Sequence, residues 1–381
     1  MKQFVIRFFH ATVFALCSFF NKKTNHNPNK ILFYSDLGFR DNVKALFDYI
    51  IENNLNEKYT IVCATNDYKQ FTSMQLQHVT FKNKWWGFWE YFSAGNVFYC
   101  FGRIPILPGK NQNVVQLWHG SPLKAASKKM LEKNLSDKLF FTHIIASSDF
   151  FVDVLSQWFS FPKEKIFVCG QPRNDKLFKQ SHYNLGEYEK LILWLPTFRN
   201  SSQMGHDSSQ NQVLPIFQEN DFKELNDFLK QLNVKIIVKL HPVQNIDNYN
   251  LVDLENFILL SNDEFTKREM DLYLLCSQAD AMITDYSSIY FDYLLLNRPI
   301  AFTEDDIENY SSQRGFSVKN QDECKPGFRI KTKQDFYQFV TDIVTEKDDY
   351  KIERKNVNSW ANTYTDNKSS ERVLKLVGIS K

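Results

Sequence analysis

Several common sequence signatures are missing from this chain of 381 residues. The six cysteines are scattered and include no CxxC pair, which argues against a zinc site or a disulfide framework and fits a reducing cytoplasm. Neither a GxSxG elbow nor a GxxxxGK(S/T) phosphate loop occurs, so nucleophilic hydrolysis and P-loop chemistry have no support. The formal net charge is only +2, too small to create a global field that would select nucleic acid.

The composition is otherwise that of a globular protein. At roughly 100–200 residues per domain, the length suggests two domains. Apolar residues make up 43% of the chain and charged residues 24%, which is ordinary for a soluble core. Aromatic residues reach 15%, with 35 Phe, and this abundance fits either an AT-rich genome or a functional aromatic surface.

The N-terminal segment is mostly apolar from Phe4 to Phe20 and contains Arg7 and His10. It has no small-x-small cleavage site, and it is short for the ~20 apolar residues that a membrane span needs. On a helical wheel a polar stripe forms, made of Gln3, Arg7, His10, Ser18 and Asn21. This pattern predicts an amphipathic, interfacial membrane helix over residues 1–24. Packing of the helix against its own domain is the alternative.

Residues 81–92 (FKNKWWGFWEYF) are a second candidate for a membrane-facing surface. Trp and Lys together suit the headgroup region of a bilayer. The alternative is a buried core segment with a few exposed lysines.

From residue 30 onward, short apolar runs alternate with longer amphipathic ones, which predicts an α/β fold with parallel sheets and helices on both faces. A polar stretch, Ser181–Glu189, reads as the linker between two such halves. The predicted domains are 25–180 and 181–365, followed by a C-terminal tail over 366–381. The predicted strands are Ile31–Tyr34, Tyr59–Ala64, Val97–Phe101, Val114–Trp118, Thr142–Ser147, Ile166–Cys169, Leu191–Leu195, Val234–Leu240, Ala281–Thr284 and Pro299–Phe302.

Polar clusters follow four of these strands. They are His119-Gly120-Ser121 in the first half and, in the second, Pro196-Thr197-Phe198-Arg199, Lys239-Leu240-His241-Pro242 and Asp285-Tyr286-Ser287-Ser288. Ligands of open parallel sheets bind at the carboxyl ends of the strands. The clusters therefore predict a site in a cleft between two sheets.

The residue types suit phosphate chemistry. Ser287 and Ser288 stand where a helix begins, so hydroxyls and free backbone N–H groups face one point, although one serine could simply cap the helix. Arg199, Lys239 and Arg314 add cations, and Asp285 could order a neighbouring His or Arg. The run Glu304-Asp305-Asp306 could suggest a metal site, but solvated loop charges are the usual interpretation, so we expect none.

Taken together, these clusters resemble the family of CDP-glycerol glycerophosphotransferases that build teichoic acids and related capsules. The resemblance extends over residues 41–315. The matching pieces are Asp41-Asn42, Trp118–Lys124, Gly170–Asp175, Pro196–Arg199, Lys239–Pro242, Ile283–Ser288 with Phe291-Asp292, and Asp306 with Tyr310 and Arg314-Gly315.

The resemblance implies a GT-B fold, two Rossmann-like domains facing a central cleft, with no required metal or other cofactor and with CMP as leaving group. It implies that His119 and His241 are essential. We expect His119 to be the base, and Arg173 and Asp175 to link domain closure to donor binding. The expected donor- and phosphate-binding residues are Arg173, Asp175, Thr197, Arg199, Lys239, Asp285, Ser287, Ser288, Asp292 and Arg314.

The expected donor is CDP-glycerol or, because related enzymes share the motifs, CDP-ribitol. The expected acceptor is a lipid-linked saccharide or a polyol-phosphate polymer, reached by a peripheral enzyme at the cytoplasmic face of the bacterial membrane. A GT-B glycosyltransferase that uses a sugar nucleotide is one alternative. A non-catalytic membrane scaffold is another, although it would not need both histidines.

Overall fold

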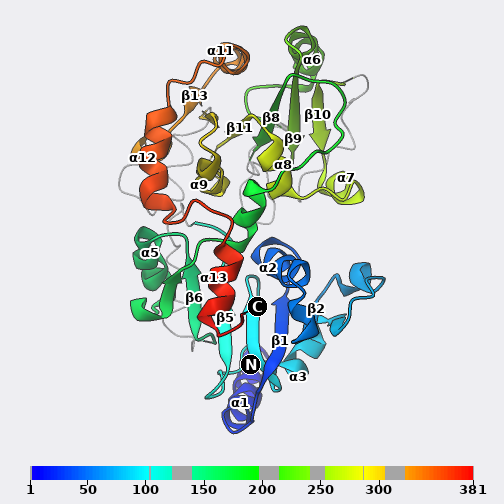
Figure 1. Ribbon diagram of the computed structural model, residues 1–381, viewed down its shortest axis with the longest axis vertical. Helices are drawn as coiled ribbons and strands as arrows, with labels where there is room; N and C mark the ends of the chain where they lie inside the picture. The colour runs from blue at the N-terminus through cyan, green and yellow to red at the C-terminus, as the bar shows by residue number, and fades with distance from the viewer. Residues whose placement is uncertain are drawn as a thin grey trace. The chain divides into compact units, whose positions relative to one another are not determined.

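The computed structural model describes residues 2–102, 104–121, 140–196, 214–240, 254–285, 287–304 and 322–380, with side chains from residue 12 onward. The chain forms two compact units, shown in Figure 1. Unit 1 comprises Met1–Gly120, Ala126–Asp175 and Thr363–Lys381, and unit 2 comprises Ser121–Ala125 and Lys176–Asn362. Each unit is an α/β body with its own sheet.

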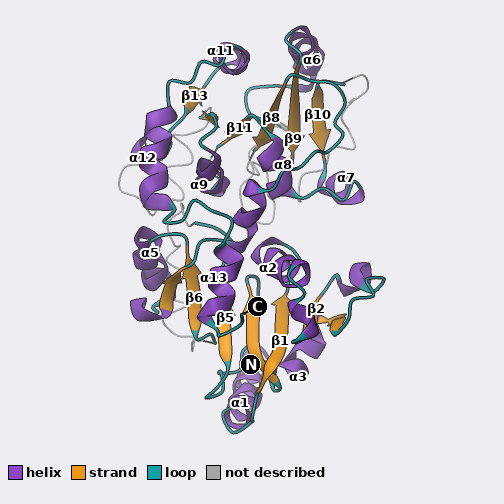
Figure 2. Ribbon diagram, viewed as in Figure 1, coloured by secondary structure: helices purple, strands orange, loops and turns teal. Residues whose placement is uncertain are grey.

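Unit 1 contains a seven-stranded sheet in the order β3-β2-β1-β4-β5-β6-β7, and the paired strands run parallel. The order of its first six strands is that of a dinucleotide-binding sheet. In this order the sequence of strands along the sheet reverses between β1 and β4, although the strands themselves stay parallel. The strands are β1 Asn27–Ser35, β2 Thr60–Thr65, β3 Val79–Asn83, β4 Ala94–Tyr99, β5 Asn113–Gln116, β6 His143–Ala146 and β7 Ile166–Val168. The helices are α1 Lys2–Asn21, α2 Asp41–Glu52, α3 Gly87–Tyr91, α5 Asp149–Phe159 and α13 Ser369–Leu376 (Figure 2).

Both faces of this sheet are buried, because successive residues of β1 pack in two different cores. Ile31 and Phe33 pack in one core with residues of α2 and α13, whereas Leu32 and Tyr34 pack in another beside α1 and α3. Successive side chains of a strand point to opposite faces, so a strand buried on both sides is a continuous apolar run. This explains why Ile31–Tyr34 lacks the alternation of a half-exposed strand.

The last turns of α1 dock onto unit 1 through the residues that the sequence assigned to its polar stripe. The Ser18 hydroxyl accepts a hydrogen bond from the Leu107 N–H at 3.0 Å, and the Asn21 amide donates to the Leu107 carbonyl at 2.9 Å. Asn21 also donates to Gln112 Oε1, and its oxygen contacts His26 Nε2. Ser18 and Asn21 are buried, so the polar side of α1 here faces protein instead of water. The side chains of Gln3, Arg7 and His10 lie outside the described part of the chain.

The C-terminal segment returns to unit 1. Val373 and Leu374 of α13 lie in the same core as α2, so the residues predicted as a tail over 366–381 are an integral layer of unit 1. The Asp175 carboxylate accepts hydrogen bonds from the backbone N–H groups of Ser369 and Ser370, both at 2.8 Å. These N–H groups have no partner inside the helix, so Asp175 satisfies the first turn of α13 from 194 residues away.

Unit 2 contains a six-stranded sheet in the order β10-β9-β8-β11-β12-β13. The strand order again reverses once, between β8 and β11. Its paired strands are also parallel. The strands are β8 Lys190–Leu195, β9 Val234–Lys239, β10 Phe257–Leu260, β11 Ala281–Thr284, β12 Ile300–Thr303 and β13 Phe328–Ile330. The helices are α6 Phe222–Gln231, α7 Asn262–Lys267, α8 Leu272–Gln278, α9 Ile289–Tyr293, α11 Lys333–Val344 and α12 Lys351–Ala361.

The predicted α/β fold with two parallel sheets is confirmed. The predicted domain boundary near residue 180 lies close to the change of unit after Asp175. Strands β3, β10 and β13 were not predicted, and β3 falls partly within the segment interpreted as a membrane surface or a core segment. Among the described residues, no helix combines the length and apolarity that crossing a bilayer requires.

Replacing Asp175 with Ala should destabilise unit 1, because two N–H groups at the buried start of α13 lose their acceptor. We expect the free energy of unfolding to fall by about 1–3 kcal/mol, measured by chemical denaturation. Asp366→Ala is the matched control, since it removes a half-exposed ion pair with Arg372 and should cost at most about 1 kcal/mol. Equal losses in the two variants would contradict the capping role of Asp175.

Candidate active-site residues

The loop after β5 presents His119 on a strained turn at the carboxyl edge of the unit 1 sheet. Trp118 has a φ of 53°, in the left-handed region that side-chain-bearing residues rarely adopt, and Gly120 follows with a φ of 124°. Such strain persists only where surrounding contacts impose it, and it concentrates at functional sites. The turn therefore marks His119 as a residue whose position is constrained.

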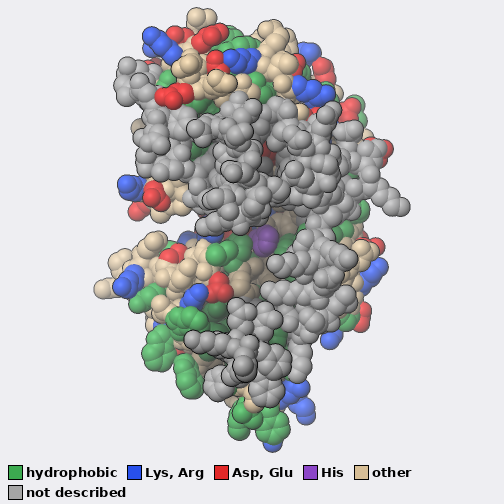
Figure 3. Space-filling view, turned by 180° about the vertical axis from the view of Figure 1, so that it is seen from behind, with side chains coloured by type: hydrophobic (Ala, Val, Ile, Leu, Met, Phe, Trp, Pro, Cys, Tyr) green, Lys and Arg blue, Asp and Glu red, His purple; other side chains and the backbone are tan. Residues whose placement is uncertain are grey.

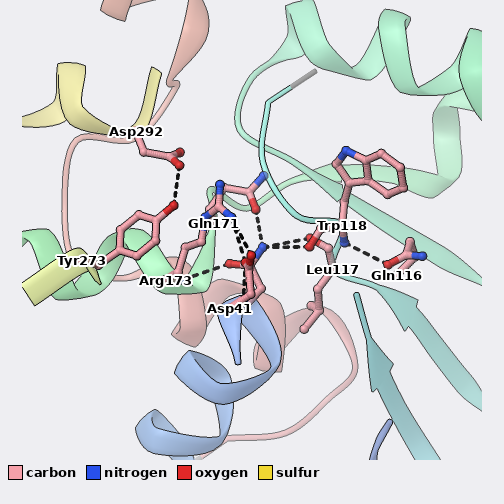
Figure 4. A network of polar contacts seen from close by, with 9 residues as sticks. Asp41, Gln116, Leu117, Trp118, Gln171, Arg173, Tyr273 and Asp292 are labelled. Carbon is pink, nitrogen blue, oxygen red and sulfur yellow. Dashed lines mark hydrogen bonds and ion pairs between the residues drawn. The ribbon is translucent and has the colours of Figure 1, made fainter. Parts of the chain in front are cut away.

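The side chain of Asn42 supplies that constraint. Its amide nitrogen donates to the Leu117 and Trp118 carbonyls, both at 3.1 Å, and lies 2.5 Å from Gln171 Oε1 (Figure 4). Its oxygen accepts from the Arg173 N–H at 3.1 Å. Asn42 is fully buried, so it joins the His119 loop, the start of α2 and the loop after β7 inside unit 1.

An ion pair lies beside this amide. Arg173 Nη1 contacts both carboxylate oxygens of Asp41, at 2.8 and 2.9 Å. The arginine side chain is 7% exposed, so the pair is largely shielded from water and links α2 to the same loop after β7. Together with Asn42, it joins two of the motif pieces, Asp41-Asn42 and Gly170–Asp175, in unit 1.

Aromatic rings surround the His119 imidazole. It stacks on Trp118 with 4.1 Å between ring centroids, and on Phe101 with 5.3 Å. Although the residue as a whole is exposed, burial by its surroundings lowers the pKa of His119 below its usual 6.5. Asp41 opposes this shift and Arg173 reinforces it. A lowered pKa keeps the imidazole neutral at neutral pH, the form that accepts a proton.

In unit 2, the described candidates also stand at the carboxyl edge of the sheet. Lys239 ends β9, and its ammonium group lies 5.0 Å from the centre of the Phe265 ring. Asp285 follows β11 and is buried. Ser288 occupies the position before α9. Its side chain makes no capping hydrogen bond, so Ser288 does not cap this helix through its hydroxyl. Ser287 and Ser288 are both half-buried.

Asp292 is buried in unit 2. Its carboxylate accepts a hydrogen bond from the Tyr273 hydroxyl at 2.8 Å, which links α9 to α8, and the residue is 1% exposed (Figure 4). The contact gives Asp292 a role in packing the helix that follows Ser288.

The first acidic residue of the suspected metal motif is neutralised by cations. Glu304 is buried, accepts a hydrogen bond from Lys325 Nζ at 2.9 Å and forms an ion pair with Arg329 Nε at 3.2 Å. Over the part of the chain that the structure describes, no group of three acidic, His or Cys side chains is arranged to hold a metal ion. Asp305 and Asp306 lie outside that part.

Four predicted site residues also lie outside the described residues: Thr197, Arg199, His241 and Arg314. Sequence reasoning assigned no role to Asn42, Trp118, Phe101 or Tyr273. Asn42 follows Asp41 at a helix start, a position that normally indicates capping, and long-range hydrogen bonds leave no local pattern. The strained φ of Trp118 likewise has no sequence signature, because bulky residues are the least expected there.

Two parallel sheets, each with one reversal of strand order and with polar side chains at its carboxyl edge, define a two-domain α/β protein of the GT-B type. The family model described as CDP-glycerol:poly(glycerophosphate) glycerophosphotransferase matches residues 16–378, and the chain belongs to this family. The predicted family is thereby confirmed.

Individual proteins agree with this assignment. The chain is 28% identical over 358 residues to the teichoic acid poly(glycerol phosphate) polymerase of Bacillus spizizenii, with 86% of each chain covered. It is 27% identical to the teichoic acid ribitol-phosphate primase of the same organism, with 71% of each covered. A solved structure of the wall teichoic acid polymerase TagF, soaked with CDPG, matches 99% of this chain and 97% of that chain, with a TM-score of 0.76 at 23% identity.

Replacing Asn42 with Ala should loosen the His119 loop. Each buried group left without a partner costs about 1–3 kcal/mol, so denaturation should show a clear loss of stability. Because His119, the expected base, would be misplaced while the unit 2 cations stay intact, kcat should fall about tenfold or more with little change in KM for the donor.

The matched control for Asn42 is Asn96→Ala. Asn96 is also a buried asparagine of unit 1, and its amide donates to the Pro28 carbonyl at 2.9 Å, near the amino ends of the strands. This variant should lose stability without a specific fall in kcat. A similar fall in kcat for both variants would contradict the positioning role of Asn42.

Proposed function

We propose that this protein transfers glycerol phosphate from CDP-glycerol to a hydroxyl of an acceptor, with release of CMP. The observation that supports this most directly is His119. A strained turn presents it at the ligand-binding edge of the unit 1 sheet, and its lowered pKa favours the neutral form. An alcohol is a poor nucleophile at neutral pH, and a neutral imidazole in reach of its proton is a suitable general base.

The proposed step is an in-line displacement at the phosphorus that bears the glycerol. The acceptor oxygen forms a new bond to that phosphorus while the bond to the CMP oxygen breaks. His119 takes the hydroxyl proton, and the negative charge moves onto the departing CMP. The product is a phosphodiester, one unit longer than the acceptor.

We assign stabilisation of that charge to unit 2. Lys239 stands at the carboxyl edge of its sheet, and Ser287 and Ser288 lie between β11 and α9. With His241, Thr197, Arg199 and Arg314, which the sequence places after strands or in the matching motifs, they would contact the donor phosphates. Cations and hydroxyls fixed before the reaction stabilise developing charge without reorganising.

A positioning role fits four other predicted site residues better than contact with the donor does. They are Arg173, Asp175, Asp285 and Asp292. Arg173 and Asp175 have polar contacts inside unit 1, and Asp292 contacts Tyr273. We propose that they hold the catalytic loops and helices in place instead of touching the donor. Asp285 is buried at the start of its loop, which favours the same kind of role.

We propose a lipid-linked saccharide or a growing polyol-phosphate polymer as the acceptor, reached from the cytoplasmic face of the cell membrane. Membership in the family and the similarity to a teichoic acid polymerase support a polymer of the cell envelope. Such acceptors are held at a membrane, so a peripheral enzyme with a membrane-binding surface would meet them there.

CDP-ribitol is the second candidate donor, because similarity to the ribitol-phosphate primase is almost as high as to the glycerol-phosphate polymerase. Purified protein offered CDP-glycerol, CDP-ribitol and UDP-sugars with a lipid-linked disaccharide would separate the possibilities. Release of CMP from CDP-glycerol supports the proposal, release of UDP would indicate a glycosyltransferase, and no turnover with any donor would favour a scaffold.

His119→Ala and His241→Ala should each lower turnover by at least ~100-fold, as expected when a general base or a charge-stabilising group is lost. Both variants should keep the unfolding midpoint of the parent protein. Near-normal turnover in a folded variant would remove the role assigned to that histidine.

The pH profile separates the two roles. Only neutral His119 accepts a proton, so kcat/KM should decline on the acid side as the imidazole is protonated, with the midpoint of the decline below the usual histidine value because the pKa is lowered. The residual activity of His119→Ala should lack this acidic decline, whereas His241→Ala should keep it. A decline that persists in His119→Ala would assign the base elsewhere.

Activity should survive EDTA, since the expected chemistry relies on side-chain cations and Glu304 is already paired with Lys325 and Arg329. CMP release would be followed before and after chelation and after adding back Mg²⁺ or Mn²⁺. A complete loss that the metal restores would show that the reaction depends on an ion.

A further inference from the structure

Large apolar side chains are unevenly exposed over the surface of this protein. Of the 13 exposed large hydrophobic residues in the described part of the chain, seven lie on two short segments of unit 1, within α1 and around α3. We call these seven residues the aromatic face: Val13, Leu16, Phe19, Phe20, Trp85, Trp86 and Trp89. The three tryptophans are 56–71% exposed, which is unusual for side chains of this size.

The two segments adjoin one another through Phe88. Phe14 of α1 stacks on Phe88 of α3 with 6.0 Å between ring centroids, and Trp85 stacks on Phe88 at the same distance. Figure 3 shows apolar side chains gathered at this end of unit 1, over α1 and α3. Segments some 70 residues apart in the sequence thus contribute to one surface.

Helical spacing explains why α1 leaves apolar residues outside. Phe14, Cys17, Ser18 and Asn21 recur at three- and four-residue intervals and face unit 1, and Ser18 and Asn21 are fixed there by hydrogen bonds. Val13, Leu16 and Phe20 recur at similar intervals and are exposed. The last turns of the helix are therefore held by a face that carries Ser18 and Asn21, and Val13, Leu16 and Phe20 are left facing outward.

Positive charge accompanies the aromatic face. By sequence, residues 1–24 and 81–92 hold six Lys or Arg and one Glu, a formal charge of +5, whereas the whole chain has +2, so the remaining residues sum to −3. Of the six cations, Lys22, Lys23, Lys82 and Lys84 have described side chains. Lys23 lies 4.2 Å from the Phe19 ring centre and Lys84 lies 5.4 Å from that of Trp85. Glu90, the one acidic residue of these two ranges, pairs with Lys30 and Lys82, and Lys84 pairs with Asp36 at 3.0 Å.

We propose that the aromatic face is a single docking surface for a bilayer with anionic lipids, built jointly by α1 and the segment around α3. Trp side chains and lysines suit the headgroup region, and the apolar side chains of α1 would enter the acyl boundary. The excess of positive charge on the two segments favours an anionic bilayer as the binding partner. A second copy of the chain would present the same basic face, and the two faces would repel each other. The inference rests on the proposed membrane location and specifies the surface and the lipid class.

The test is co-sedimentation of the full chain with vesicles of phosphatidylcholine alone or mixed with phosphatidylglycerol. The parent protein should prefer the anionic vesicles, and salt should weaken its binding. Leu16→Gln with Phe20→Gln, and separately Trp85→Gln with Trp89→Gln, should each lower the partition coefficient by about tenfold or more. Lys22→Gln with Lys23→Gln should reduce the preference for anionic lipid.

Matched controls are Leu37→Gln and Ile352→Gln, which remove exposed apolar side chains outside the aromatic face. They should bind vesicles like the parent protein. Equal binding by parent, control and aromatic-face variants would overturn the proposal, as would a parent dimer in light scattering that the aromatic-face variants convert to monomer.

Turnover separates this inference from the proposed reaction. Aromatic-face variants should release CMP normally with a short soluble acceptor and slowly with an acceptor embedded in vesicles. If parent protein binds vesicles but releases no CMP from any acceptor, the proposed reaction fails and the docking surface stands. If the variants work normally on embedded acceptor, the docking surface fails and the reaction stands.

Discussion

The buried amide of Asn42 is the contact on which the rest of the unit 1 site depends. One side chain satisfies two carbonyls of the His119 loop and holds the loop after β7 through Gln171 and Arg173. A buried amide left partly unsatisfied would be costly, so these segments are constrained to keep their mutual positions. That constraint makes the left-handed backbone at Trp118 tolerable, and the strained turn in turn fixes where the imidazole of His119 stands.

The two units share the order of six strands and present different side chains at the carboxyl edge. Each reverses strand order once, and each presents polar side chains at the carboxyl edge of its strands. Unit 1 offers an imidazole flanked by aromatic rings, with Asp41 and Arg173 exerting opposite effects on its pKa. Unit 2 offers a lysine and hydroxyls suited to phosphate oxygens. In the proposed reaction the proton is accepted in unit 1 and the charge of the leaving group is stabilised from unit 2.

Polar and apolar residues exchange their expected roles at the N-terminal helix. In isolation, a polar stripe on an apolar helix suggests that the stripe faces water. Here the buried hydrogen bonds of Ser18 and Asn21 reverse that arrangement, because Leu107 and Gln112 offer partners that water would otherwise supply. Val13, Leu16, Phe19 and Phe20 are left exposed, and stacking through Phe88 joins this end of α1 to the segment with the three tryptophans. The sequence presented these two segments as separate candidates for a membrane surface.

The sequence by itself determined the α/β class, the two parallel sheets, most strand positions and the family, because these depend on local periodicity and on motifs that are contiguous in the chain. His119 and the polar residues at the ends of β9 and β11 were predicted as site residues for the same reason, since strand ends define the ligand edge. The structure alone decided what depends on long-range contacts. Asp175 satisfies a helix that begins 194 residues later, Asn42 joins two loops to the start of α2, and residues 366–381 form part of unit 1. Hydrogen bonds between distant segments and the strain they impose on Trp118 leave no periodic trace, so only the folded chain reveals them.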